Sequence, residues 1–231
     1  MQPELHPRST YPVAGEIGLP QQRVLRNTYL LLALTMVPTV IGAMVGMATG
    51  GIIMQHPIIS TLVMLGAVIG LQFAIAANRD SGLGVVLLLL MTFLLGWWLG
   101  PLLTVALALR NGPQLVGFAA LGTGAIFFIM AGIATTTKRD YSFMGKFLFV
   151  GMIALLIAML ANMFLQIPAL ALTISTLVIV VFSLFLLHDV SRIVNGGETN
   201  YVMATTGVYL SLFNIFANLL SLLMALTGER D

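Results

Sequence analysis

Seven long apolar runs, separated by short polar breaks, constrain this chain more than any other feature. Each run has about 20 or more mostly apolar residues, the length that a helix needs to cross the hydrocarbon core of a bilayer. In that core the backbone polar groups must bond within the segment, which a helix achieves. The runs cover residues 24–48, 57–77, 83–109, 113–134, 144–165, 168–188 and 200–226. We therefore predict an all-α integral membrane protein, a bundle of seven transmembrane helices within residues 24–228.

The composition excludes a water-soluble fold. Hydrophobic residues make up 59% of the chain and charged residues only 8%, whereas a soluble domain carries about 25% charged residues. The apolar runs use nearly the whole length and leave no room for a soluble enzymatic domain. Because the chain has no cysteine, disulfides and cysteine-ligated metal centres are impossible. The 10 basic residues are scattered over the polar breaks and form no patch for nucleic acid.

The first 23 residues are polar and contain Pro3, Pro7, Pro12 and Pro20. The apolar run that follows has about 25 residues, more than the 7 to 15 of a cleavable signal peptide. We expect a retained first span, preceded by a disordered N-terminal tail at residues 1–23.

Basic residues predict the orientation, because Lys and Arg in short loops favour the cytoplasmic side. With seven spans, eight of the 10 basic residues fall on the side of the N-terminus, and only Arg110 and Arg230 fall on the other. This places the N-terminus in the cytoplasm and the C-terminus outside. The shortest break is at residues 166–168. If the helix continued through it, six spans would remain and the C-terminus would change sides.

Three of the runs carry glycines four residues apart. Such small residues let helix backbones approach closely in a membrane. The pairs are Gly42 with Gly46, Gly66 with Gly70, and Gly96 with Gly100. We interpret them as packing positions within the bundle, and a dimer interface is the alternative.

The last run carries small and hydrogen-bonding residues along one helix face, which we call the polar stripe. Its members follow one another at alternating spacings of 3 and 4 residues. They are Ala204, Gly207, Ser211, Asn214, Asn218, Ser221 and Ala225. We expect the stripe to face the bundle interior, where it either bonds to neighbouring helices or lines a hydrated path.

His188, Asp189 and Arg192 stand at the end of the sixth run and are the main ionisable candidates. Arg192 follows Asp189 by three residues and His188 by four, so either can pair with it on a helix. His188 and Asp189 project about 100° apart, and we do not expect them to form a relay. One interpretation is a charged cluster at the membrane boundary. The other turns Asp189 inward near Ser211, where a carboxylate can bind a proton or, weakly, calcium.

Catalytic patterns are missing from the sequence. A nucleophile needs a base within reach, but His56 and His188 fall on opposite sides of the membrane. A pair of carboxylates that share a proton needs two embedded acids, and Asp189 is the one candidate. We predict a protein that is not an enzyme, with no cofactor and no metal beyond the weak calcium alternative.

Two C-terminal segments, residues 188–201 with the string GGETNY and residues 208–220, resemble the signature of the Bax inhibitor-1 (transmembrane BAX inhibitor motif) family. Residues 24–29 and 138–143 also match it. The resemblance is strongest to the bacterial branch and implies a seven-helix bundle whose last helix is enclosed by the other six. Family members are associated with a pH-sensitive leak of calcium or protons. The bacterial branch is linked to modulation of the membrane-anchored protease FtsH, together with HflK and HflC.

One position departs from the calcium-leak members. In those members the resemblance implies a pair of aspartates, one on each of the last two helices. This chain has Asp189 at the first position and Ser211 at the second. Two close carboxylates hold a shared proton because both cannot easily ionise, and a lone Asp189 lacks that property. The resemblance therefore favours an inner-membrane protein that modulates FtsH through protein contacts, and an ion leak through the bundle is the alternative.

Overall fold

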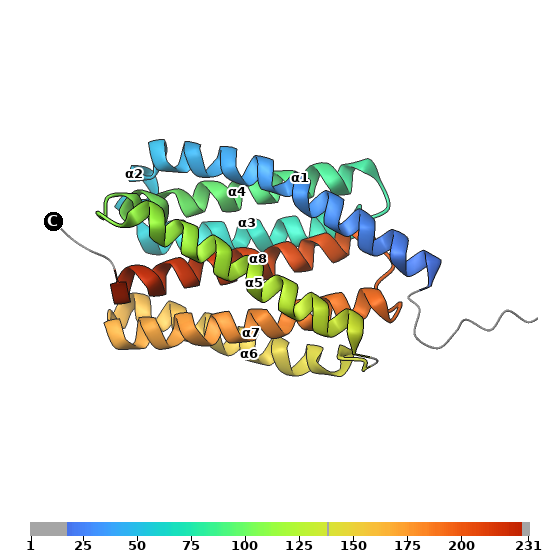
Figure 1. Ribbon diagram of the computed structural model, residues 1–231. Helices are drawn as coiled ribbons and strands as arrows, with labels where there is room; N and C mark the ends of the chain where they lie inside the picture. Colours follow the sequence, from blue (N-terminus) through green and yellow to red (C-terminus); the bar gives the residue numbers. More distant parts are fainter. Residues whose placement is uncertain (1–17, 138, 228–231) are drawn as a thin grey trace, which may run out of the picture.

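The computed structural model describes residues 18–137 and 139–227, and this part of the chain is a bundle of α-helices (Figure 1). Seven helices are long and apolar enough to cross a membrane. The helices are α1 (Leu19–Thr49), the short α2 (Gly51–Gln55), α3 (Pro57–Ala77), α4 (Gly82–Leu107), α5 (Gly112–Thr136), α6 (Gly145–Leu165), α7 (Pro168–Val194) and α8 (Tyr201–Thr227), with a 3₁₀ turn η1 (Ser142–Met144) before α6. The predicted all-α bundle with seven spans is confirmed.

Two helix ends refine the predicted spans. α1 begins at Leu19, with proline in its first turn, where the missing N–H costs nothing. The first span thus starts inside the predicted tail, and residues 1–17 of that tail lie outside the described residues. The break before Pro168 is real, because Gln166 has a left-handed φ of 52° at the end of α6. The alternative of six spans is therefore wrong.

Glycines bring α1 and α4 into close contact. A Cβ on Gly42 or Gly46 would meet the backbone of α4 at Phe93 or Trp97. From the other side, Gly96 and Gly100 lie against the backbone of α1 in the same way. Because backbone atoms meet here, only glycine allows this separation, and these four glycines lie where the predicted packing role requires them.

The glycine pair of α3 behaves differently. A Cβ on Gly66 or Gly70 would meet no atom within 4 Å, and both residues are exposed. Their predicted role in packing inside the bundle is wrong, because α3 turns this face away from α4, its main neighbour.

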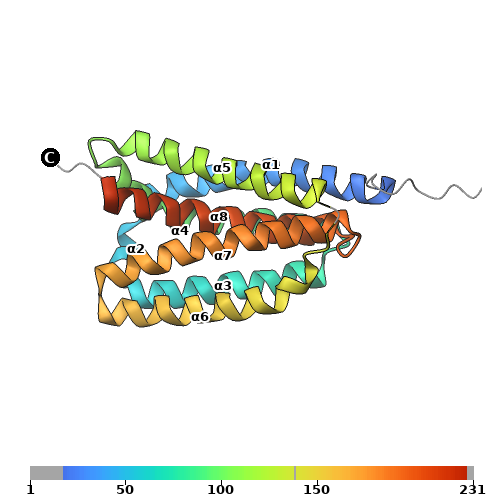
Figure 2. The ribbon, with the colours of Figure 1, turned by 60° about the horizontal axis from the view of Figure 1, so that its bottom comes forward.

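The helix α8 packs against α1, α3, α4, α5 and α7. In Figure 2 it runs between α5 and α7, and α6 lies against the far side of α7. Its buried residues come from several faces and include Val202, Thr206, Tyr209, Ile215 and Leu220. The complete enclosure of α8 by six helices stays a prediction.

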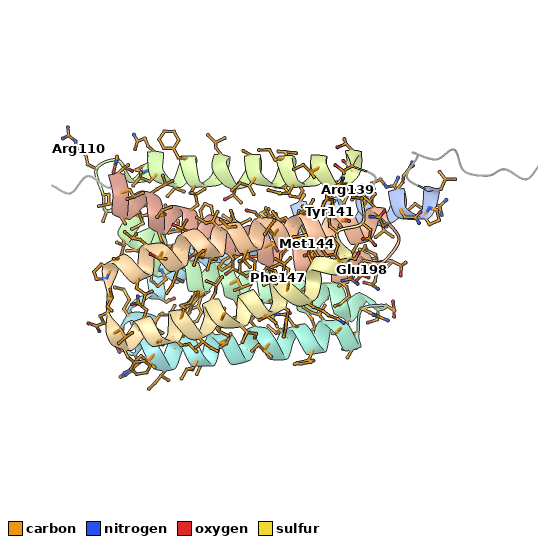
Figure 3. The ribbon with its side chains drawn as sticks, turned by 90° about the horizontal axis from the view of Figure 1, so that it is seen from below. Arg110, Arg139, Tyr141, Met144, Phe147 and Glu198 are labelled. Carbon is orange, nitrogen blue, oxygen red and sulfur yellow. The ribbon has the colours of Figure 1, made fainter. Side chains whose placement is uncertain are left out.

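Large apolar side chains cover the outside of the bundle. Phe73 of α3, Phe128 of α5 and Phe147 of α6 are 74%, 73% and 78% exposed, and Phe147 is labelled in Figure 3. In water a surface of this kind would be an aggregation hazard. In lipid the same side chains meet hydrocarbon, in agreement with the membrane spans.

Candidate functional site

The candidate site lies where α7 ends and α8 begins, at the end of the bundle that holds the first residues of α1 (Figure 1). α7 continues to Val194, past the predicted end at residue 188, so the ionisable residues lie in its last two turns. Gly196 then adopts a left-handed φ of 76°. The N–H of Gly197 donates to the carbonyl of Arg192 over 2.8 Å. This glycine-dependent cap reverses the chain and explains the first glycine of the GGETNY string.

His188 and Asp189 form a pair. The Nδ1 of His188 lies 2.9 Å from Oδ1 of Asp189, and the two side chains are 10% and 18% exposed. We expected these neighbours to project about 100° apart and to form no relay, yet their side chains meet although their Cβ atoms diverge. In this buried setting the hydrogen bond is stronger than it would be in water.

Two glycines make room for this pair. A Cβ on Gly145, the first residue of α6, would lie 2.7 Å from Nε2 of His188. A Cβ on Gly207 of α8 would lie 2.7 Å from Oδ2 of Asp189. The carboxylate therefore faces the polar stripe at Gly207, one turn before the buried Ser211. Gly207 was predicted as a helix-packing position, and the atoms nearest to it belong to the Asp189 carboxylate.

Arg192 pairs with a residue outside the predicted set. Its Nη2 lies 3.3 Å from Oε2 of Glu198 and donates to the carbonyl of Gly197 over 3.2 Å. The predicted pairing of Arg192 with Asp189 or His188 is wrong. The turn at Gly196 folds Glu198 back along α7, and Asp189 is already bonded to His188.

Asn200 ties this junction to a distant loop. Its Oδ1 accepts the N–H groups of Val202 and Met203 over 3.0 and 3.1 Å, which caps the start of α8. Its Nδ2 donates to Oδ1 of Asp80 over 2.8 Å and to the carbonyl of Arg79 over 3.0 Å. The α7–α8 junction and the α3–α4 loop are thereby joined.

The segment after α5 closes the other side of the site. The N–H of Tyr141 donates to Oγ of Ser191 over 3.0 Å. Hydrogen bonds from Ser142, one of them from its N–H over 2.8 Å, lower the pKa of the Asp140 carboxyl below its usual 3.8. The nearby His188 acts in the same direction. Tyr141 and Glu198 are labelled at this end in Figure 3.

Farther along α8, Asn214 and Asn218 bond to their own helix. The Nδ2 of Asn214 donates to the carbonyl of Leu210 over 2.8 Å, and that of Asn218 to the carbonyl of Asn214 over 2.9 Å. One prediction was that these amides bond to neighbouring helices. They bond to α8 itself, because the carbonyl four residues earlier in the same helix is always within reach. Both side chains are half-buried, and their role in any hydrated path stays a prediction.

The sequence reasoning missed three residues of this region as site residues: Glu198, Asn200 and Tyr209. The Tyr209 side chain is 1% exposed, and its hydroxyl bonds to Oγ1 of Thr39 over 2.8 Å and donates to the carbonyl of Thr92 over 3.3 Å. A tyrosine within a membrane span needs a hydrogen-bond partner for its hydroxyl, and this rule could have identified Tyr209 from the sequence. The other two belong to the GGETNY string, where only their family resemblance was considered.

Fold and site together define a helical membrane protein whose polar residues meet at the junction of the last two spans. Residues 21–228 match the family described as "Inhibitor of apoptosis-promoting Bax1". The chain belongs to the Bax inhibitor-1 family, and the predicted resemblance is confirmed.

Its relatives include several bacterial proteins. It is 40% identical to an uncharacterized membrane protein of Vibrio cholerae over 94% of this chain and 96% of the relative. It is 38% identical to the Escherichia coli K12 protein named "Modulator of FtsH protease YccA" over 89% of this chain and 91% of the relative. In another Escherichia coli strain an equally similar relative is named "Inner membrane protein YccA". An uncharacterized protein of Pseudomonas aeruginosa is 36% identical over 89% of this chain and 90% of the relative.

Proposed function

We propose that this protein modulates the FtsH protease in the bacterial inner membrane through protein–protein contacts, as an interaction protein and not as an enzyme. One observation carries the proposal: the 38% identity to YccA, which extends over nearly the whole of both chains. HflK and HflC, the expected companions of FtsH, are the further partners that we propose. The exposed apolar faces of α3 and α6 support it, since they offer surface to another membrane protein.

The proposed orientation puts the candidate site in the cytoplasm. Arg139 and Arg110 mark opposite ends of the bundle in Figure 3. Most basic residues of the described chain lie at the Arg139 end, which we place inside by the positive-inside rule. They are Arg23, Arg26, Arg79, Arg139, Lys146 and Arg192. In this orientation the residues before α1 are offered to the cytoplasmic unfolding machinery, and the C-terminus is periplasmic.

Co-purification with FtsH, HflK and HflC in a mild detergent tests the proposal. We expect the full chain to bring down the protease, and deletion of residues 2–17 to weaken or alter that association. A variant with the same residues in scrambled order is the matched control for tail length. Absence of any association, both in detergent and after cross-linking in intact membranes, would refute the proposed function.

A proton or calcium leak is the second candidate, and the buried pair of His188 and Asp189 beside Gly207 favours it. Ser211, Asn214 and Asn218 would then line the path. Against calcium, α8 contains no Asp or Glu to face Asp189, and no group of three metal-ligating side chains occurs among the described residues.

Flux through proteoliposomes tests the leak. If Asp189 and the stripe carry ions, Asp189→Asn and Asn214→Ala should each reduce proton or calcium flux. Equal flux in the wild type and both variants would exclude a path along these residues.

A further inference from the structure

An apolar groove opens on the side of the bundle between α1 and α5, and we call it the α1–α5 groove. It encloses about 750 Å³, within the range of ligand pockets. Val40 of α1 and Phe128 of α5 stand at its rim and are 58% and 73% exposed. Its floor includes Tyr209 and Phe213 of α8. The groove faces the surface that the spans present to lipid.

The Tyr209 hydroxyl on its floor and the two threonine hydroxyls in its lining already have partners. The Tyr209 hydroxyl and Oγ1 of Thr39 bond to each other over 2.8 Å, and Oγ1 of Thr123 donates to the carbonyl of Ala119 over 2.7 Å. Near one end, the rings of Tyr29 and Phe127 meet edge to face at 5.8 Å. The groove therefore offers hydrocarbon and aromatic surface to its occupant, which suits an acyl chain and not an ion.

The dimensions also favour an acyl chain. The groove follows α1 from Tyr29 to Ala43, a rise of about 21 Å at 1.5 Å per residue. One leaflet contributes about 15 Å of hydrocarbon, so a lipid tail fits this length.

Cations stand at one end of the groove. Arg26 precedes Tyr29, Ala33, Met36 and Val40 at spacings of 3, 4, 3 and 4, so it continues the same face of α1. Arg26 is exposed, and among the described residues no ion pair joins it to a carboxylate.

The exposed Arg139, which follows α5, lies at the same end (Figure 3). Basic pockets between membrane helices are typical sites for anionic lipid headgroups.

We propose that the α1–α5 groove binds an acyl chain of an anionic phospholipid, whose headgroup phosphate lies beside Arg26. The lipid comes from the leaflet at the end where α1 begins. This site does not depend on the proposed modulation of FtsH, and it would exist whether or not the protease binds.

Native mass spectrometry of the full chain in mild detergent, with phosphatidylglycerol or phosphatidylcholine added, tests the apolar part of the site. Ala120→Trp fills the groove from an exposed position of α5, and we expect several-fold less bound phosphatidylglycerol. Ala125→Trp is the matched control, since Ala125 is also exposed on α5 but does not line the groove. Ala33→Trp repeats the test from α1 should Ala120→Trp fail to fold.

The charged part of the site has its own test. Arg26→Gln should reduce the preference for phosphatidylglycerol over phosphatidylcholine about fivefold, the effect of one basic residue near an anionic surface. Arg110→Gln, at the opposite end of the bundle, should leave the preference unchanged. Equal lipid retention in the Ala120→Trp and Ala125→Trp variants would overturn the proposal. So would a photo-cross-linker at position 33 that captures protein in place of lipid.

Discussion

Gly46→Ala should loosen the crossing of α1 and α4. The new Cβ would lie 2.9 Å from the carbonyl carbon of Trp97, where ordinary contacts begin at 3.4 Å. The two backbones must therefore separate by at least 0.5 Å, the difference of these two distances. No side-chain rotation can relieve this clash, because both sides are backbone or Cβ atoms.

The magnitude follows from two opposing effects. Overpacking a close contact costs about 1–3 kcal/mol, whereas replacing a helical glycine by alanine gains about 0.5–1 kcal/mol. We expect a net loss of about 1–2 kcal/mol in the free energy of unfolding. For a chain of this size that lowers the melting temperature by about 2–8 °C.

Thermal unfolding in detergent or nanodiscs measures this loss, and Gly66→Ala is the matched control. A Cβ on Gly66 meets no atom within 4 Å, so the control should keep or slightly raise the melting temperature through its better helix propensity. Equal losses in the two variants would refute the assignment of α1–α4 packing to Gly46. A loss in Gly66→Ala alone would mean that the exposed face of α3 is the tighter contact.

Three further substitutions test the junction and the polar contacts of α8, again by unfolding. Tyr209→Phe removes a hydroxyl that joins α8 to α1 and α4. It should cost about 0.6–1.7 kcal/mol, the range of hydrogen bonds between membrane helices, whereas Tyr201→Phe, at a 37% exposed position, should have little effect. Asn200→Ala removes the cap of α8 and should lower the free energy of unfolding by about 1 kcal/mol. An unchanged free energy of unfolding would contradict the capping role of Asn200. Hydrogen bonds lower the pKa of Asp140, so its ionised form stabilises the fold above the usual 3.8, and this contribution disappears as the pH falls through the lowered pKa. Asp140→Asn should therefore be less stable than the wild type at pH 7, and the gap should close in acid; a gap that is constant with pH would contradict the hydrogen-bond assignment.

The His188–Asp189 pair shows why the site was harder to predict than the spans. Helix geometry correctly separates the Cβ atoms of adjacent residues, but it does not predict the rotamers that bring Nδ1 and Oδ1 within 2.9 Å. Those rotamers depend on the space left by Gly145 and Gly207, which belong to other helices. The interaction of Arg192 with Glu198 likewise depends on the reversal at Gly196.

The seven spans could be predicted from the sequence because their cause is local. About 20 apolar residues with no water to bond their backbone must be helical wherever they lie in the bilayer. The family resemblance could likewise be identified from the sequence of residues 188–220 without any knowledge of the structure. The role of each glycine pair was decided by tertiary structure. Gly42 with Gly46 and Gly66 with Gly70 have the same spacing, yet the first pair touches α4 and the second faces outward. The difference arises from which neighbour each helix face meets, and that depends on the packing of all the helices together.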